Sequence, residues 1–216
     1  MNHLMVDLET LDTKNSAIVL SLGACCFNGE SLIQSVEINT SERMYIELDL
    51  KDQESAGRTI SIDTLDWWIK QKPGLEQFDI KALKKYTLVQ TIEALDKFIL
   101  DNRIDCIWSN GPSFDMVIIE SIYNSHSTRP FMIKYSNWYD FKTIRCIRKL
   151  LNLPEIKFEG QIHNSLNDAM YQAMTVNNTL VELKEHFKST NFNPFYQPED
   201  DKFNLKDMDL IIDMNS

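Results

Sequence analysis

Short apolar stretches alternate with polar breaks in the first part of the chain. Stretches rich in Val, Ile and Leu occupy residues 4–8, 17–27 and 31–38, and turn residues such as Asn28-Gly29 separate them. Runs of this length bounded by turn residues are typical of β-strands joined by tight turns. The pattern therefore predicts a meander of three antiparallel strands.

The spacing of the apolar residues changes further along the chain. A short extended segment is expected at 44–48, followed by a polar loop through Gly57. Apolar residues then recur at the three- and four-residue spacing of helices. Asp63 is expected to cap a helix that ends at Pro73-Gly74, because Asp accepts hydrogen bonds at a helix start and Pro-Gly breaks a helix.

The middle of the chain predicts a helix, a strand and a second helix. Thr87 and Gln90 form a capping box ahead of a helical apolar stripe. The residues of that stripe are Leu88, Ile92, Leu95 and Ile99. Residues 104–108 are apolar enough for a buried strand, and the turn at 110–112 leads into a helix with one apolar face.

Two more helices, near 141–151 and from Ser165 onward, complete the pattern. Strands first, followed by helices around a later strand, indicate an α/β fold in which helices cover a sheet. The last residues contain two prolines, an acidic cluster at 199–201 and little periodicity. We therefore expect one domain over residues 1–187 and an acidic C-terminal tail or extension at 188–216.

Composition limits the classes of protein to consider. The chain has 216 residues, of which 43% are hydrophobic, so one well-filled core is expected. No apolar run approaches the length of a membrane span, and the N-terminus has no signal-peptide pattern, so we expect a soluble, cytoplasmic protein without a membrane partner. The four cysteines include no Cys-x-x-Cys pair, which favours free, mostly buried thiols over zinc ligands or disulfides.

The net charge of −10 counts against a large surface for sequence-independent binding of nucleic acid, because Lys and Arg drive such binding. It does not count against an enzyme that holds only a strand end. Such a site needs few phosphate contacts, and bound metal ions would add positive charge.

The first candidate for chemistry is the pair Asp7 and Glu9 at the end of the first strand. Two carboxylates one residue apart on a strand point to the same face, and their charges repel unless a cation holds them together. A hard divalent ion such as Mg²⁺ suits such a pair. The alternative is a solvated pair of acids on the surface of an acidic protein.

Three further residues stand at helix starts or next to them. Asp115 and Asp168 each lie in the first turn of a predicted helix, where the helix dipole alone favours an acid. His163 precedes Asp168 by five residues, and by itself it fits a surface histidine. Together with the strand acids they make four carboxylates and one base, the set that two close metal ions and a proton acceptor require.

These segments resemble the three exonuclease motifs of the DEDDh (DnaQ-like) 3′-5′ exonuclease family. The motifs are Asp7-Leu8-Glu9-Thr10, residues 108–115 ending in Asp115, and His163 to Asp168. The resemblance covers about residues 1–187 and implies a ribonuclease H-like fold. In that fold three antiparallel strands lead into parallel strands, and helices flank this mixed sheet.

Two other segments are similar to one branch of this family. Trp67-Trp68 followed by Gln71, and residues 140–145, resemble the branch of exonuclease VIII-like and mycobacterial-type 3′-5′ exoribonuclease domains. This branch also makes a homodimer a plausible assembly.

The resemblance implies a role for each motif residue. Asp7 is expected to bridge two Mg²⁺ or Mn²⁺ ions, with Glu9 and Asp168 completing the site of the ion that activates water. Asp115 is expected to help hold the second ion beside the leaving oxygen, and His163 to act as general base. The expected reaction releases nucleoside 5′-monophosphates from the 3′ end of RNA or DNA.

The resemblance also suggests residues that touch the substrate. Leu8, Thr10 and Leu11 stand where family members contact the terminal nucleotide. Neighbours on a helix point about 100° apart, so one of Trp67 and Trp68 is expected in the core and the other accessible for base stacking.

Basic residues after position 140 suggest a contact with phosphates. The candidate face carries Lys142, Arg145, Arg148 and Lys149. Arg145 is the preferred phosphate contact, and a solvated helix face is the alternative.

Two other functions compete with the exonuclease. One is a ribonuclease H or integrase-type endonuclease on the same fold, which the His163 to Asp168 element disfavours. The other is a catalytically silent nucleic-acid-binding domain. The presence of all five motif residues and the acidic composition both count against it.

Overall fold

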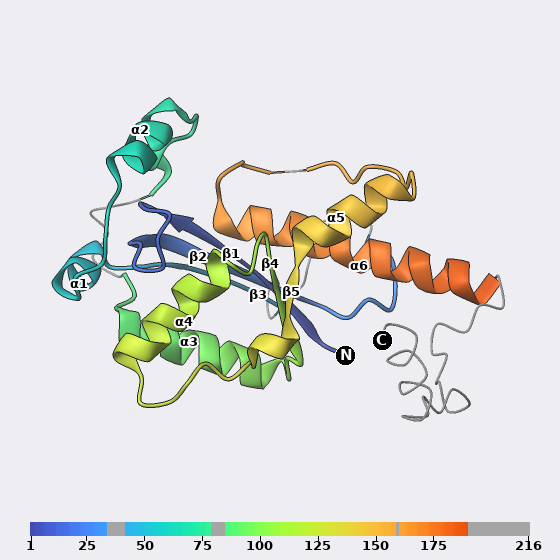
Figure 1. Cartoon of the computed structure of the whole chain (residues 1–216), viewed down its shortest axis with the longest axis horizontal. Coiled ribbons are helices and arrows are strands. Elements are labelled where there is room, and N and C mark those ends of the chain that lie inside the picture. The colour runs from blue at the N-terminus through green and yellow to red at the C-terminus, as the bar shows by residue number, and fades with distance from the viewer. Residues whose placement is uncertain (34–41, 79–84, 159, 190–216) are drawn as a thin grey trace, which may run out of the picture. The chain divides into compact units, whose positions relative to one another are not determined.

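A mixed sheet with the strand order β3-β2-β1-β4-β5 forms the centre of the fold (Figure 1). The computed structural model describes residues 1–33, 42–78, 85–158 and 160–189. The strands are β1 (His3–Thr10), β2 (Val19–Phe27), β3 (Arg43–Glu47), β4 (Cys106–Ser109) and β5 (Trp138–Asp140). Three of them, β3, β2 and β1, pair antiparallel, and β4 and β5 continue the sheet in parallel with β1. This is the mixed sheet expected from the sequence.

Two strand predictions need correction. The structure forms its third antiparallel strand from β3, where only a short extended piece was expected. Residues 31–33 of the stretch predicted as that strand are not in a strand, and the rest of it lies outside the described residues. The strand β5 was not predicted, because three residues are too few to show a period.

Helices cover the sheet on both faces (Figure 1). They are α1 (Leu50–Ser55), α2 (Ile62–Lys70), α3 (Leu88–Asp101), α4 (Asp115–His126), α5 (Phe141–Leu150) and α6 (Ser165–Ser189), and short 3₁₀ turns occupy Leu75–Gln77 and Tyr135–Asn137. The predicted capping box is present, since the Thr87 side chain accepts from Gln90 N and the Gln90 side chain accepts from Thr87 N. The short helix α1 was wrongly predicted as loop.

The two faces of β1 belong to different layers of the core. Leu4, Val6 and Leu8 pack with the apolar sides of α3 and α4. Met5 faces the other way and packs with α5 and α6. Because successive side chains of a strand alternate, Asp7 lies on the same face as Met5, toward α6.

The segment around α2 forms a third cluster that includes Leu11, Trp68 and Phe78. The N-cap of α2 is Ser61 and not Asp63 as expected, because Asp63 is the second residue of the helix. The prediction for the tryptophan pair is confirmed, since Trp68 is 1% exposed and Trp67 is 41% exposed.

Contacts divide the chain into two units, Met1–Val181 and Glu182–Ser216. The second unit is described only over residues 182–189, which are the end of α6. Apart from its first two residues, the predicted tail at 188–216 lies outside the described residues, and its boundary stays a prediction. No helix in the described part of the chain is long and apolar enough to span a bilayer.

The four cysteines are free, as predicted. Cys25 and Cys106 are buried, whereas Cys146 on α5 is exposed. Cys25 and its neighbour Cys26 pack into the cores on opposite faces of the sheet.

Candidate active site

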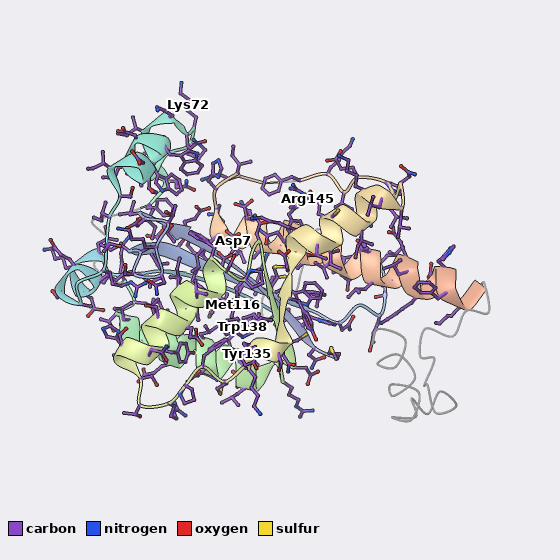
Figure 2. The ribbon with its side chains drawn as sticks, viewed as in Figure 1. Asp7, Lys72, Met116, Tyr135, Trp138 and Arg145 are labelled. Atoms are coloured by element: carbon purple, nitrogen blue, oxygen red, sulfur yellow. The ribbon has the colours of Figure 1, made fainter. Side chains whose placement is uncertain are left out.

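The second half of β1 places two carboxylates beside α6: Asp7, labelled in Figure 2, and Glu9. Asp7 is 9% exposed and Glu9 is 8% exposed, so both are almost fully withdrawn from water. The Gln172 side chain on α6 donates a hydrogen bond of 2.8 Å from Nε2 to Asp7 Oδ1. This contact orients the Asp7 carboxylate from the face opposite α3 and α4.

Asp115 reaches the same region from the first residue of α4, which follows β4 along the chain. It is 3% exposed and accepts a hydrogen bond of 3.2 Å at Oδ1 from the Leu8 N–H of β1. The parallel pairing of β1 with β4 aligns the ends of the two strands, and Asp115 therefore stands beside Asp7 although 108 positions separate them in the sequence.

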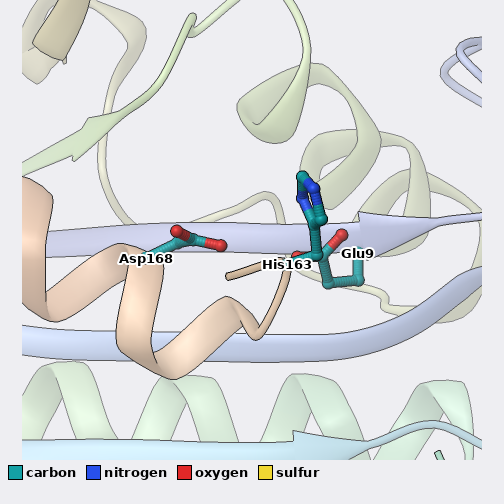
Figure 3. Close-up of side chains that lie close together, drawn as sticks. All are labelled: Glu9, His163 and Asp168. Atoms are coloured by element: carbon teal, nitrogen blue, oxygen red, sulfur yellow. The ribbon is translucent and has the colours of Figure 1, made fainter. Parts of the chain in front are cut away.

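Glu9, His163 and Asp168 form the other side of the cluster (Figure 3). One ligand atom from each of these residues lies within 4.8 Å of the others. The Asn164 side chain caps α6 by accepting from Asn167 N at 3.2 Å. The structure thus brings all five motif residues together where β1 ends, beside the starts of α4 and α6.

The pKa values of the four carboxyl groups are raised. Burial is the largest cause for Glu9, whose pKa rises to about 8, and repulsion from Asp168 and Asp115 adds to it. Burial also raises the pKa of Asp115 to about 7 and that of Asp168 to about 6. For Asp7, burial and then repulsion from its acidic neighbours raise the pKa, and the Gln172 hydrogen bond partly opposes them.

This donor set fits divalent cations. Buried carboxylates that repel one another gain most from a nearby positive charge, and oxygen ligands are those that Mg²⁺ and Mn²⁺ prefer. The described residues place no lysine or arginine in an ion pair with any of the four acids. A cation is therefore the natural partner of the cluster.

His163 is held against aromatic rings. Its ring packs edge-on against Trp67 at 4.8 Å and against Trp68 at 6.1 Å between centroids. Partial burial lowers the pKa of His163, which keeps the imidazole neutral and able to accept a proton near pH 7. The backbone at His163 has φ of 57°, a left-handed conformation that turns the chain into α6.

A cavity of about 440 Å³ adjoins the cluster on the side of α2. Its lining includes Leu8, Glu9, Thr10, Thr13, Asp63, Thr64, Trp67, Trp68 and Phe114. Four of the predicted substrate contacts thus line it. Leu11 does not, because its side chain is 5% exposed and packs in the core with Trp68. Arg145 lies apart from it on α5, beside a second cavity.

Three residues near the site were not singled out from the sequence. Gln172 follows Asp168 by four positions, so helical spacing places it on the same side of α6. Phe114 directly precedes Asp115 and lines the cavity. Gly23 pairs with Asp7 across β1 and β2, and a Cβ there would lie 2.2 Å from the backbone of Ser165.

Comparison with known proteins gives one family and one fold. The family model described as the 3′-5′ exoribonuclease Rv2179c-like domain matches residues 2–180. No curated protein matches the chain.

Similar solved structures are those of exonuclease I. An apo exonuclease I structure has a TM-score of 0.55 at 10% identity, covering 88% of this chain and 44% of the other. A zinc-bound complex of Escherichia coli exonuclease I with single-stranded DNA has a TM-score of 0.51 at 13% identity, covering 92% and 41%. At these identities the likeness concerns the fold alone, and the chain spans less than half the length of these proteins.

Proposed function

Because the chain belongs to the family of 3′-5′ exoribonuclease Rv2179c-like domains, we propose that it is a cation-dependent 3′-5′ exonuclease. It would hydrolyse the terminal phosphodiester bond of RNA or DNA and release a nucleoside 5′-monophosphate. The observation that carries this proposal is the cluster of four carboxylates, three of them buried and Asp168 half-buried, with His163 beside it.

The four acids would hold two ions, Mg²⁺ or Mn²⁺. Glu9 and Asp168, which lie close together beside His163, would hold one, and Asp115 would hold the other, with Asp7 between them as a shared ligand. The chemistry that divalent cations supply in such sites is activation of water and neutralisation of charge on the phosphate and the leaving oxygen. A bound cation would relieve the repulsion among these acids, which adds to burial in raising the pKa values of Asp7 and Glu9.

His163 is the proton acceptor in the proposed reaction. Its neutral imidazole takes the proton from the attacking water as the bond to phosphorus forms. Packing against Trp67 and Trp68 restricts the orientation of the ring, which keeps its nitrogen beside Glu9 and Asp168.

The 440 Å³ cavity is the proposed place of the terminal nucleotide. The exposed ring of Trp67 offers a face on which a base can stack, and Phe114 adds apolar surface. Thr10 is fixed by two contacts: its hydroxyl donates to Asp12 O at 2.8 Å, and its carbonyl accepts from Trp68 Nε1 at 2.9 Å. Leu8 and Thr10 would contact the sugar or base from the strand side.

The description of the family favours RNA as the substrate. Single-stranded DNA is the second polymer to test, because it is bound in an exonuclease I structure of similar fold. A homodimer and a cytoplasmic location stay predictions, supported by the branch resemblance and the composition.

The test incubates 5′-labelled RNA and DNA, each single- and double-stranded, with Mg²⁺ or Mn²⁺. We expect a ladder of 3′-shortened products that a chelator abolishes. Asp7→Asn should abolish the ladder, whereas Asp101→Asn, an exposed acid on α3, should leave it intact. Internal cuts would favour the endonuclease instead, and equal activity of Asp7→Asn would refute the proposed site.

A further inference from the structure

A second cavity, of about 620 Å³, lies beside α5 and carries a different chemistry from the first. Its walls are α5, the segment that follows this helix, and the middle of α6. Lys142, Arg145 and Lys149 line it along α5, and Tyr171 lines it from α6. We call this cavity the α5 groove.

The α5 groove is basic in a protein of net charge −10. The helix α5 carries four basic residues and no acidic one. Its three exposed members, Lys142, Arg145 and Lys149, form no ion pair with any described residue, and Glu155 is the single acid of the lining. The three positive charges therefore face a groove that offers them little compensation, which suits an anionic ligand.

The walls of the α5 groove are held in place. The buried Arg148 guanidinium donates to Pro154 O from Nε at 2.9 Å and from a terminal nitrogen at 2.6 Å. It also donates to Thr179 Oγ1 at 3.0 Å, so it ties the segment after α5 to α6. The groove is thus built by the fold and does not depend on a ligand for its shape.

An aromatic ring forms part of the lining. Tyr171 is half-buried and meets Phe141 and Phe158 edge-on, with centroid distances of 6.3 and 5.4 Å. These contacts restrict the orientation of the Tyr171 ring, which lines the α5 groove. Cations along one wall and an aromatic ring on the other match the phosphates and bases of a single strand.

One end of the α5 groove, at Lys142, lies near Asp115 of the acid cluster. The charge of Lys142 acts on Asp115, lowering its pKa in opposition to burial. Tyr171 is adjacent in sequence to Gln172, whose side chain bonds Asp7. The 440 Å³ cavity adjoins the cluster at Glu9 and is lined by α2, whereas Arg145, labelled with Asp7 in Figure 2, stands on α5 and lines the α5 groove. The two cavities are therefore built by different elements around the site.

We propose that the α5 groove binds the nucleotides on the 5′ side of the scissile phosphate, an inference that rests on the proposed exonuclease function. Lys142, Arg145 and Lys149 contact successive backbone phosphates, and Tyr171 stacks on a base. From Lys142 to Lys149 the helix rises about 10 Å, which exceeds the reach of one phosphate group. The strand thus runs from the cavity at α2, across the acids, and along α5.

The experiment measures kcat/KM on 5′-labelled RNA and DNA of 2 to 12 nucleotides at several salt concentrations. The variant Arg145→Glu/Lys149→Glu is compared with Lys97→Glu, an exposed lysine on α3 whose Nζ lies 2.6 Å from Asp101. We expect the groove variant to raise KM about 10-fold or more on long substrates and progressively less as the substrate shortens. Its salt dependence should weaken by about 0.7 in log–log slope for each lost phosphate contact.

Fluorescence anisotropy of the same oligonucleotides gives an independent reading. Arg145→Gln should weaken binding of long strands, and Arg145→Lys should largely restore it, because a lysine keeps the charge. If the double variant does not fold, as judged by thermal melting, these single variants decide the question.

Three results would overturn the proposal. Unchanged binding and salt slope in the groove variants would remove the groove from the substrate path. A loss of equal size on dinucleotides and long strands would mean that the groove acts on the site and not on the upstream strand. Tighter retention of inorganic phosphate or a free mononucleotide than of a long strand would indicate a separate anion site. A wild-type protein that binds but never cleaves would instead refute the proposed function, while the binding data still judge the groove.

Discussion

Substitution of Gly23 by alanine tests whether the active-site geometry depends on the close approach of β2 to α6. Gly23 pairs with Asp7, and a Cβ at this position would lie 2.2 Å from the carbonyl carbon and oxygen of Ser165. It would also lie 2.3 Å from Leu166 N. All three atoms belong to the backbone at the start of α6, so no side chain can rotate away to relieve the overlap.

The overlap sets the size of the expected effect. The start of α6 must move by about 1 Å before the new contact reaches the ordinary distance of 3.4 Å. Overpacking of this kind costs about 1 to 3 kcal/mol of the free energy of unfolding. Loss of the 2.8 Å hydrogen bond between the Ser21 and Ser165 hydroxyls would add about 1 kcal/mol.

The same movement displaces Asp168, three residues into the helix, from Glu9 on β1. A misplacement of about 1 Å can cost about 10²-fold in rate, so kcat/KM of Gly23→Ala should fall by about that factor. The assays are urea unfolding and the 3′-end cleavage assay. Gly57→Ala is the matched control, because its φ of 76° strains alanine but no atom lies within 4 Å of the new Cβ. It should lose stability and keep activity. A Gly23→Ala protein with wild-type stability and rate would refute the reasoning.

Four further predictions concern the site. The pKa of Glu9 is raised from 4.5 to about 8, so its contribution to stability is present below pH 4.5 and is lost as the pH rises through 8. Urea unfolding in chelator should therefore show that Glu9→Gln stabilises the cation-free protein at pH 8 by about 3 to 5 kcal/mol and changes little at pH 4. Trp68→Ala should cost about 3 to 5 kcal/mol of stability. Trp67→Ala should cost far less and should instead weaken binding of the terminal nucleotide by about 1 to 3 kcal/mol, measured as KM. His163→Ala should lower kcat by about 10²-fold or more while calorimetry shows unchanged Mn²⁺ affinity, and a loss of that affinity would make the histidine a ligand. Gln172→Ala, which frees the Asp7 carboxylate, should lower Mn²⁺ affinity or kcat by about 10-fold or more, and no change in either would show that the hydrogen bond is dispensable.

The long elements of the fold were predictable because each carries its own periodic signal. The α3 helix shows this best, since its capping box and apolar stripe lie within the helix itself. The elements that the sequence did not predict are short. The three residues of β5 and the six of α1 form because neighbouring strands and helices supply their partners, and a local pattern cannot show those partners.

The residues of the candidate site also differ in how far the sequence could predict them. The acids and His163, which the structure brings together, were singled out through motif spacing, since the proposed chemistry requires those residue types at those positions. Gln172 and Gly23 were not, because their importance comes from contacts across 165 and 142 positions of sequence. A glutamine on a helix and a glycine in a strand can each have many purely structural explanations. Only the fold shows that these two lie against Asp7 and Ser165.

The acid cluster opposes folding, and this explains why it needs so rigid a support. The pKa of Glu9 is about 8 and that of Asp115 is about 7. Without a cation, a large fraction of both carboxyl groups is therefore protonated near neutral pH. Ionising them there costs several kcal/mol against a total stability of about 5 to 15 kcal/mol. The strand β1 keeps its structure in spite of this cost because it is hydrogen-bonded between β2 and β4 and has a packed core on each face. Cations that occupy the site must displace those protons, so their affinity should rise with pH up to about 8, and the site should stabilise the fold when it is filled.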